Sequence, residues 1–191
     1  DVVVENVKFE RFSEPCLHFE SMTSGLAQSA VSIRGCDFVT NPKQAILIES
    51  GEASSVQSSG FKITNNTVSG CGYTNGEACM DIRGIVDIHG LRITTIAAGN
   101  TARNNAGIRL RYNQASPYGS AGAGLSKVSN FYIENTDSSA TDCCGINAGG
   151  NHVIISGGTI WMKDADDTVG IYLEGGSAEG DSTNYTSIDN V

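Results

Sequence analysis

A short motif that recurs seven times along the chain constrains its fold more than any other feature of the sequence. In each copy an apolar residue is followed two places later by Asn or Gly, and further apolar residues come next. The marker residues are Asn6, Gly35, Asn65, Gly90, Asn130, Gly157 and Asn190, spaced 25 to 40 residues apart. Asn and Gly enter the left-handed backbone region most cheaply, so the repeat predicts a tight bend at each marker.

Alternating apolar residues flank each predicted bend. In the fourth copy Val86 and Ile88 precede Gly90, and Ile93 follows it. β-Branched and aromatic residues at every second position are typical of strands that bury one face. Each copy of the motif therefore predicts two short strands joined by a sharp corner.

A further alternating segment between successive corners predicts a third strand. Its copies are Leu17–Glu20, Ile46–Glu49, Met80–Arg83, Ile108–Arg111, Ile146–Gly149 and Ile171–Glu174. The first and third residues of each copy are expected to point inward, and the other two outward. Three strands per repeat describe a coil of parallel β-sheet, in which stacked coils lie about 4.8 Å apart and like residues cover like residues.

Two other fold classes fit the sequence less well. An alternating βαβ protein is disfavoured because no ten-residue segment shows helical periodicity. A β-sandwich would need hairpin turns, and the single Asn75-Gly76 pair lies within a longer loop. We therefore predict an all-β solenoid of about six to seven coils, with three strands per coil, that covers residues 1–191 as one domain. Both ends interrupt the solenoid, so we expect a piece of a longer polypeptide.

Composition and charge exclude several kinds of partner. The formal net charge is −9, whereas nucleic-acid binding depends on clustered Lys and Arg, so no nucleic-acid partner is expected. No apolar run approaches the roughly 20 residues that span a membrane. The six cysteines lack zinc-site spacing. Cys71 and Cys79 would close a short loop as a disulfide, but buried reduced thiols are the favoured interpretation.

The predicted coil resembles the right-handed, single-stranded parallel β-helix of pectate-lyase-like proteins and phage tailspikes. In that family the short corner often carries an Asn ladder, which Asn6, Asn65, Asn130 and Asn190 would form here. The resemblance covers essentially the whole chain. It implies a fold but no single activity, because one fold hosts many functions.

The resemblance also indicates where a ligand would bind, since the third strand usually lines the saccharide groove in this family. Its outward residues form two predicted columns. The first is His18, Leu47, Asp81, Arg109, Asn147 and Tyr172, and the second is Glu20, Glu49, Arg83, Arg111, Gly149 and Glu174. Arginine pairs with carboxylates in a bidentate manner, and tyrosine offers a flat apolar face with a hydroxyl. These columns suit an extended sugar chain.

Glycoside hydrolysis requires two carboxyl groups, about 5–5.5 Å apart for retention or about 6.5–9.5 Å for inversion. The predicted stacking admits Glu20 with Glu49, or Glu49 with Asp81, and these three are the candidate catalytic residues. Elimination by a lyase would instead use Arg83 or Arg109 as the base. The candidate substrate-binding residues are His18, Arg83, Arg109, Arg111, Asn147, Tyr172 and Glu174. The competing interpretation of such charges is a set of solvated cross-strand ion pairs.

Two further features are less specific. Asp164, Asp166 and Asp167 offer oxygen ligands for calcium, but the spacing lacks a full calcium loop, and a solvated acidic turn is preferred. No cofactor is otherwise expected. Trp161 follows the inward Ile160 and is either a sugar-stacking platform or a packing contact with a neighbouring chain.

Three functions remain open at this stage. The first is the β-helix of a phage tailspike-like receptor-binding protein, which binds and in some cases degrades a cell-surface polysaccharide. Such spikes are generally trimers, so the resemblance allows a homotrimer on the virion tail. The second is an extracellular polysaccharide lyase, hydrolase or epimerase that acts as a monomer. The third is a structural or adhesive solenoid without catalysis.

Overall fold

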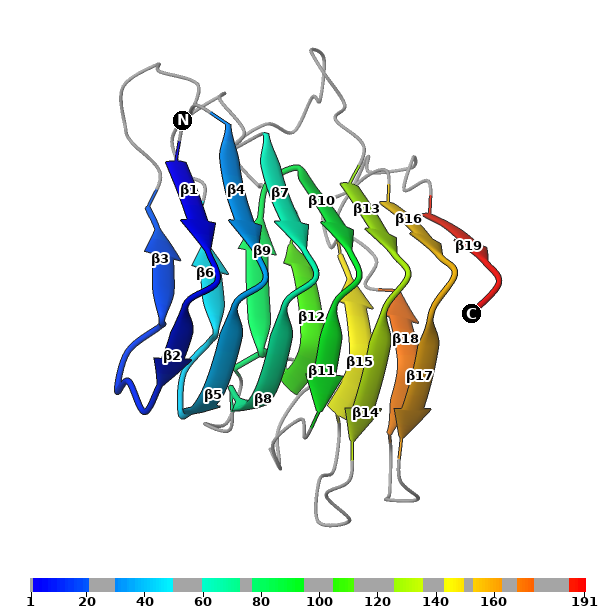
Figure 1. Cartoon of the computed structure of the whole chain (residues 1–191). Coiled ribbons are helices and arrows are strands. Elements are labelled where there is room, and N and C mark those ends of the chain that lie inside the picture. Colours follow the sequence, from blue (N-terminus) through cyan, green and yellow to red (C-terminus); the bar gives the residue numbers. More distant parts are fainter. Residues whose placement is uncertain are drawn as a thin grey trace, which may run out of the picture.

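A computed structural model describes residues 2–20, 30–49, 60–72, 77–94, 105–111, 126–135, 143–149, 153–162, 168–173 and 186–191. Within these ranges the chain forms strands and no helix, and every strand pairing is parallel. The strands lie in three sheets that extend along one axis (Figure 1). The predicted all-β, parallel β-solenoid with three strands per coil is confirmed.

The three sheets take successive strands of each coil in turn. The first sheet contains β1 (Val2–Glu5), β4 (Val31–Arg34), β7 (Phe61–Thr64), β10 (Val86–His89), β13 (Ser126–Ser129), β16 (Val153–Ser156) and β19 (Thr186–Asp189). The second contains β2 (Lys8–Glu10), β5 (Asp37–Asn41), β8 (Thr67–Cys71), β11 (Arg92–Thr94), β14 (Tyr132–Asn135) and β17 (Thr159–Met162). The third contains β3 (Leu17–Phe19), β6 (Ile46–Ile48), β9 (Met80–Arg83), β12 (Asn105–Arg111), β15 (Cys143–Ala148) and β18 (Val169–Leu173).

The bends between the first and second sheets lie at the seven marker residues. Their φ angles are all positive, from 49° at Asn130 to 67° at Gly90. A β-carbon added to Gly35 would lie 2.5 Å from Oδ1 of Asn6, and one added to Gly90 would come still closer to Oδ1 of Asn65. At these two corners the Asn side chain of one coil therefore occupies the space that a side chain on the next coil would need.

The interior is filled by like residues stacked coil upon coil. Ile33, Ile63 and Ile88 lie in register on β4, β7 and β10, and all three are fully buried. On the second sheet the rings of Phe9 and Phe38 stack with centroids 4.9 Å apart. Such burial removes apolar surface from water, which is the main stabilising contribution of a continuous core.

The cysteines complete this interior without cross-linking it. None of the six forms a disulfide, and the Cys79 thiol instead donates to the Cys71 carbonyl at 3.0 Å. Five of them are buried, and Cys16 is half-buried. The favoured prediction of reduced, buried thiols is confirmed.

The first predicted column on the third sheet is present in the predicted register: His18, Leu47, Asp81, Arg109, Asn147 and Tyr172 pair along successive strands. The expectation that its outward positions form a solvent-facing surface is wrong for its middle. The exposed fractions are 9% for Leu47, 0% for Asp81, 7% for Arg109 and 1% for Asn147. There Arg109 donates a hydrogen bond to Asp81, and a small apolar cluster of Ala78, Ala106 and Cys144 contacts Tyr172.

Candidate functional site

The candidate site is the outer face of the third sheet, where parallel register brings residues from different coils together. Figure 1 shows this sheet behind the other two. A residue on one strand lies beside its counterpart one coil away, at the strand spacing of about 4.8 Å. The candidate residues therefore fall into two clusters, one around Asp81 on β9 and one around His18 on β3.

The first cluster is a carboxylate held by two guanidinium groups. Asp81 accepts hydrogen bonds from Nε of Arg109 at 3.1 Å and from Nη2 of the same side chain, and it also accepts from Nε and Nη2 of Arg111. Register accounts for this contact, because Arg109 pairs directly with Asp81 and Arg111 lies two residues further along β12. We call Asp81, Arg83, Arg109 and Arg111 the arginine cluster.

The arginine cluster carries an excess of positive charge. Its three guanidinium groups and one carboxylate sum to 3 − 1 = +2, in a chain whose formal net charge is −9. Arg83 pairs in register with Arg111 and forms no ion pair with any described residue. The Arg111 side chain is 28% exposed, whereas those of Arg109 and Asp81 are 8% and 0% exposed. Arg83 and Arg111 are therefore the partly exposed members of the cluster, and the buried Asp81 carboxylate holds Arg109 and Arg111 from beneath.

The second cluster places an imidazole between two carboxylates. The His18 ring lies 2.9 Å from Glu49 Oε2 through Nε2 and 3.8 Å from Glu20 Oε1 through Nδ1. The coils of these residues are joined by a hydrogen bond from the Glu49 amide to the Phe19 carbonyl, 2.9 Å long. The Glu20 side chain is 79% exposed and that of Glu49 is 41% exposed. The imidazole is therefore within hydrogen-bond distance of Glu49, whereas its separation from Glu20 is too long for a hydrogen bond.

The two clusters meet along the second predicted column. The register of β6 with β9 places Glu49 beside Arg83, which pairs with Arg111, and the Gly149 amide continues the ladder by donating to Leu110. The column thus changes from acidic at Glu20 and Glu49 to basic at Arg83 and Arg111. Glu174, the last predicted member of this column, lies outside the described residues.

The three candidate catalytic carboxylates differ in their exposure to solvent. Asp81 is fully buried and bonded to two arginines, so its place favours a positioning role over contact with substrate. Glu20 and Glu49 are both accessible. Among the predicted binding residues, Asn147 is buried beneath the surface, and Tyr172 is half-buried against the apolar cluster. The catalytic assignments themselves stay predictions.

One ion pair near this face was not predicted from the sequence. Lys43 Nζ lies 3.1 Å from Glu77 Oε1, and Gln44 also donates to the Glu77 carboxylate. Lys43 precedes Ile46 by three residues, and Glu77 precedes Met80 by the same number. Both residues lie three positions before a strand of the third sheet, and this equal spacing indicates that they lie side by side on neighbouring coils.

Thiol and metal chemistry receive no support from the described part of the chain. Burial raises the pKa of the Cys71 thiol to about 12 and that of Cys16 to about 11, which leaves little of the nucleophilic thiolate at neutral pH. No group of three or more His, Cys, Asp or Glu side chains within the described ranges is placed to hold a metal. The predicted calcium turn at Asp164, Asp166 and Asp167 lies outside those ranges.

Comparison with models of known protein families, with curated proteins and with solved structures finds no match to this chain. A search of the described residues also finds no helix long and apolar enough to cross a membrane. The fold and the geometry of the two clusters are therefore the basis for any function.

Proposed function

We propose that this β-helix binds an extended anionic polysaccharide along the outer face of the third sheet. The observation that carries the proposal is the arginine cluster, in which a buried carboxylate holds Arg109 and Arg111 in place beside Arg83. Its excess of two positive charges favours a carboxylate-bearing sugar, because guanidinium groups match carboxylates in a bidentate manner.

Preorganisation strengthens this interpretation. Each guanidinium bonded to Asp81 is held in one orientation before a ligand arrives, so less side-chain entropy is lost on binding. The second column repeats at about 4.8 Å, and its members Glu49, Arg83 and Arg111 are partly exposed, so a chain of sugars running along this column would contact several coils in succession. The binding energies of the contacts at each coil would then add together over an extended ligand.

This proposal corresponds to the polysaccharide-binding β-helix of a tailspike-like receptor-binding protein. The partner would be a cell-surface or extracellular polysaccharide, and the site of action the virion tail or the extracellular medium. Glu20, His18 and Glu49 adjoin the arginine cluster, and they are the residues on this face that would carry out general acid–base cleavage of the bound chain.

Calorimetric titration with oligogalacturonate, an oligomer of acidic sugars, tests the binding proposal. Arg111→Ala should weaken binding by about 10- to 150-fold, because a charge-assisted hydrogen bond contributes roughly 1.5–3 kcal/mol. Lys127→Ala is the matched control, since it removes one exposed positive charge from the first sheet. Equal losses in the two variants, or equal binding of neutral oligomers, would contradict the proposal.

Cleavage has its own test. The protein without substitutions is incubated with an acidic polysaccharide, and the release of reducing ends and the ultraviolet absorbance of unsaturated products are measured. A hydrolase releases only reducing ends, and a lyase also releases the unsaturated sugar. Glu49→Gln should lower turnover by 100-fold or so, the usual size of a general acid–base contribution. Unchanged turnover in Glu49→Gln and Glu20→Gln would remove both from the mechanism.

A further inference from the structure

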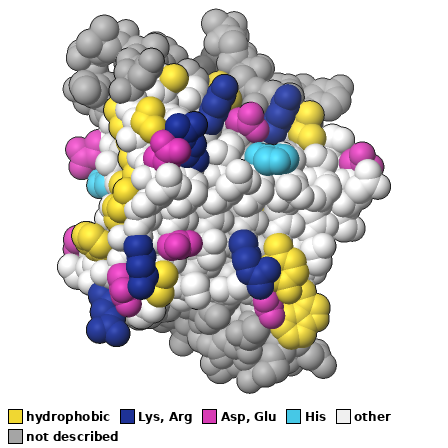
Figure 2. Space-filling view, in the orientation of Figure 1, with side chains coloured by type: hydrophobic (Ala, Val, Ile, Leu, Met, Phe, Trp, Pro, Cys, Tyr) yellow, Lys and Arg dark blue, Asp and Glu magenta, His cyan; other side chains and the backbone are white. Residues whose placement is uncertain are grey.

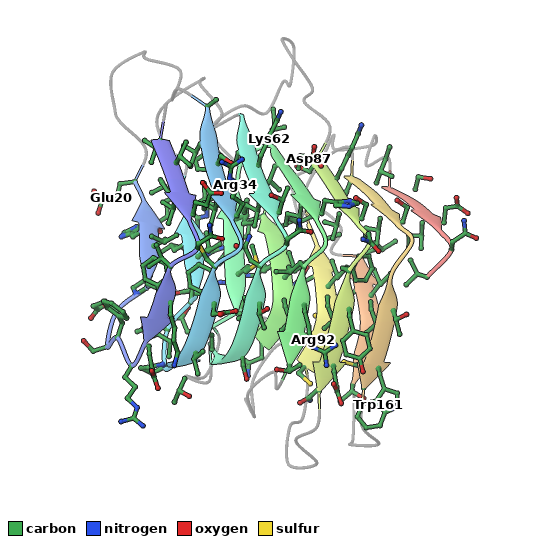
Figure 3. All side chains as sticks on the ribbon, in the orientation of Figure 1. Glu20, Arg34, Lys62, Asp87, Arg92 and Trp161 are labelled. Carbon is green, nitrogen blue, oxygen red and sulfur yellow. The ribbon has the colours of Figure 1, made fainter. Side chains whose placement is uncertain are left out.

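A second group of sugar-compatible side chains lies on the outer face of the second sheet, on β11, β14 and β17. Register places Arg92 beside Tyr132, and Glu134 beside both Thr94 and Trp161. Figure 2 shows basic, acidic and hydrophobic side chains touching there, at the lower right of the view. Figure 3 shows Arg92 on β11 and Trp161 on β17, with β14 between them in the sheet.

The polar side chains of this group hold one another in place. The Arg92 guanidinium carbon lies 4.5 Å from the centroid of the Tyr132 ring, and Arg92 Nη2 lies 3.8 Å from Glu134 Oε2. Desolvation, and next the nearby Glu134 carboxylate, raise the pKa of the Tyr132 hydroxyl. Cation–π and ion-pair contacts thereby fix a donor and an acceptor next to each other on an exposed sheet.

Trp161 supplies a flat apolar face beside this pair. It is 48% exposed although its neighbour in the sequence, Ile160, packs against the core. An indole offers a broad apolar surface with a polar N–H at its edge. A pyranose ring has the complementary form, with C–H groups on its faces and hydroxyls around its rim.

Charge and size select the class of ligand. Arg92 and Glu134 cancel, so this face favours an uncharged ring, in contrast to the excess of +2 in the arginine cluster. A specific protein partner would cover about 800 Å² on each side, with several apolar anchors. Among the described strands of the second sheet, Trp161 is the one large apolar side chain that is well exposed. The patch therefore suits one or two sugar rings better than a protein.

We propose that the outer face of the second sheet holds a second saccharide site, in which Trp161 stacks on a neutral pyranose and Arg92 and Glu134 bind its hydroxyl groups. This site is separate from the third sheet and does not depend on the anionic ligand proposed there. A polysaccharide that contains both acidic and neutral sugars would engage both faces.

The fluorescence of Trp161 provides a direct test, because it is the single tryptophan of the chain. Neutral hexasaccharides of glucose, galactose and mannose are titrated separately into the protein. We expect at least one to shift the emission in a saturable manner. Arg92→Ala and Glu134→Gln should each weaken that binding by about tenfold, as expected when a charged hydrogen-bonding partner is lost.

Calorimetry extends the test to the ring itself. Trp161→Ala should abolish the heat of binding, whereas Phe12→Ala, which removes another exposed aromatic ring, should leave it unchanged. Arg111→Ala should also leave it unchanged, which separates this site from the one on the third sheet.

Three results would overturn the second site. One is the absence of any emission shift with all three neutral oligomers. Another is a shift caused by oligogalacturonate and by no neutral sugar. The third is a shift that follows protein concentration alone, because a second copy of the chain would then cover Trp161.

Discussion

The outer faces of the first and third sheets share one alternating pattern but differ in their contact with water. On the first sheet Lys62, Asp87 and Lys127 lie in register, and all three are exposed. On the third sheet Leu47, Asp81 and Arg109 lie in register, and all three are buried. Each face places a carboxylate beside a basic residue on the neighbouring strand, Asp87 beside Lys127 and Asp81 beside Arg109, so these two pairs differ in their solvation.

This difference separates charges that a fold tolerates from charges that it depends on. An exposed pair gains little, because water already solvates each partner. A buried carboxylate, in contrast, is stable only while its hydrogen bonds are complete. The buried charges of the third sheet are therefore stable only in contact with one another. Substitutions on the two faces measure how far buried and exposed charges differ, from the largest expected effect to the smallest.

The largest effect is expected from the buried carboxylate. Asp81→Asn leaves the 8%-exposed Arg109 side chain without its counter-charge, which should lower the free energy of unfolding by about 3–5 kcal/mol. Asp87→Asn, on the next strand of the chain, should change it by less than about 0.5 kcal/mol. Urea unfolding followed by circular dichroism measures both. Similar losses in the two variants would erase the distinction between the faces.

The next effect concerns apolar residues that point outward. Leu47 on the third sheet is 9% exposed, so Leu47→Ala should lower the free energy of unfolding by about 2 kcal/mol. Ile154 points outward from β16 on the first sheet and is only half-buried. Ile154→Ala should therefore cost less than about 1 kcal/mol in the same unfolding experiment. A larger loss at Ile154 would reverse the ranking of the two faces.

The interior between the faces predicts a pH dependence. Burial raises the pKa of Cys71 from 9.0 to about 12, so the folded state keeps a proton that the unfolded state releases above about pH 9. The stability from this thiol is complete below pH 9 and is lost as the pH rises towards 12, by at most about 1.4 kcal/mol per pH unit. Cys71→Ala should make this decline less steep between pH 8.5 and 10.5, and the raised pKa values of Cys16 and Cys79 account for the remainder. An unchanged decline would assign it to other groups.

The smallest effect is expected from an exposed ion pair on the first sheet. Arg34 Nη2 lies 2.8 Å from Glu5 Oε2, with side chains 53% and 42% exposed. Glu5→Gln should lower the free energy of unfolding by no more than about 0.5 kcal/mol, and added salt should remove even that difference. Thermal unfolding at low and high salt measures it. A salt-independent loss would mean that this pair behaves like the buried one.

Much of the fold was predictable because it depends on local spacing. The left-handed bends follow from Asn and Gly at fixed positions, and the register of His18, Leu47 and Asp81 follows from stacking like positions. Alternation shows on which side of a strand a residue lies. It does not show what covers that side, and for this reason the burial of Asp81 and Arg109 was not foreseen.

The candidate site was predictable in position but not in internal geometry. Residue numbers place Arg111 two positions beyond Arg109, yet they do not show that both guanidinium groups turn onto one carboxylate. The His18 contact with Glu49 likewise depends on side-chain rotation across neighbouring strands. Packing and electrostatics together determine these side-chain orientations. Because of them, Asp81, predicted as a catalytic acid, lies where it orients two arginines.

The alternation of Asn and Gly at the corners has a consequence for how such a chain can lengthen or shorten. Asn6 and Asn65 lean over Gly35 and Gly90 on the next coil, so in each of these pairs of coils one corner carries a side chain and the other does not. Duplication of one coil would bring two Asn corners or two Gly corners together, whereas duplication of a pair would keep the order. We therefore expect a unit of two coils to be the module that recombination and design can repeat with the least change at the corners, although the visible repeat is one.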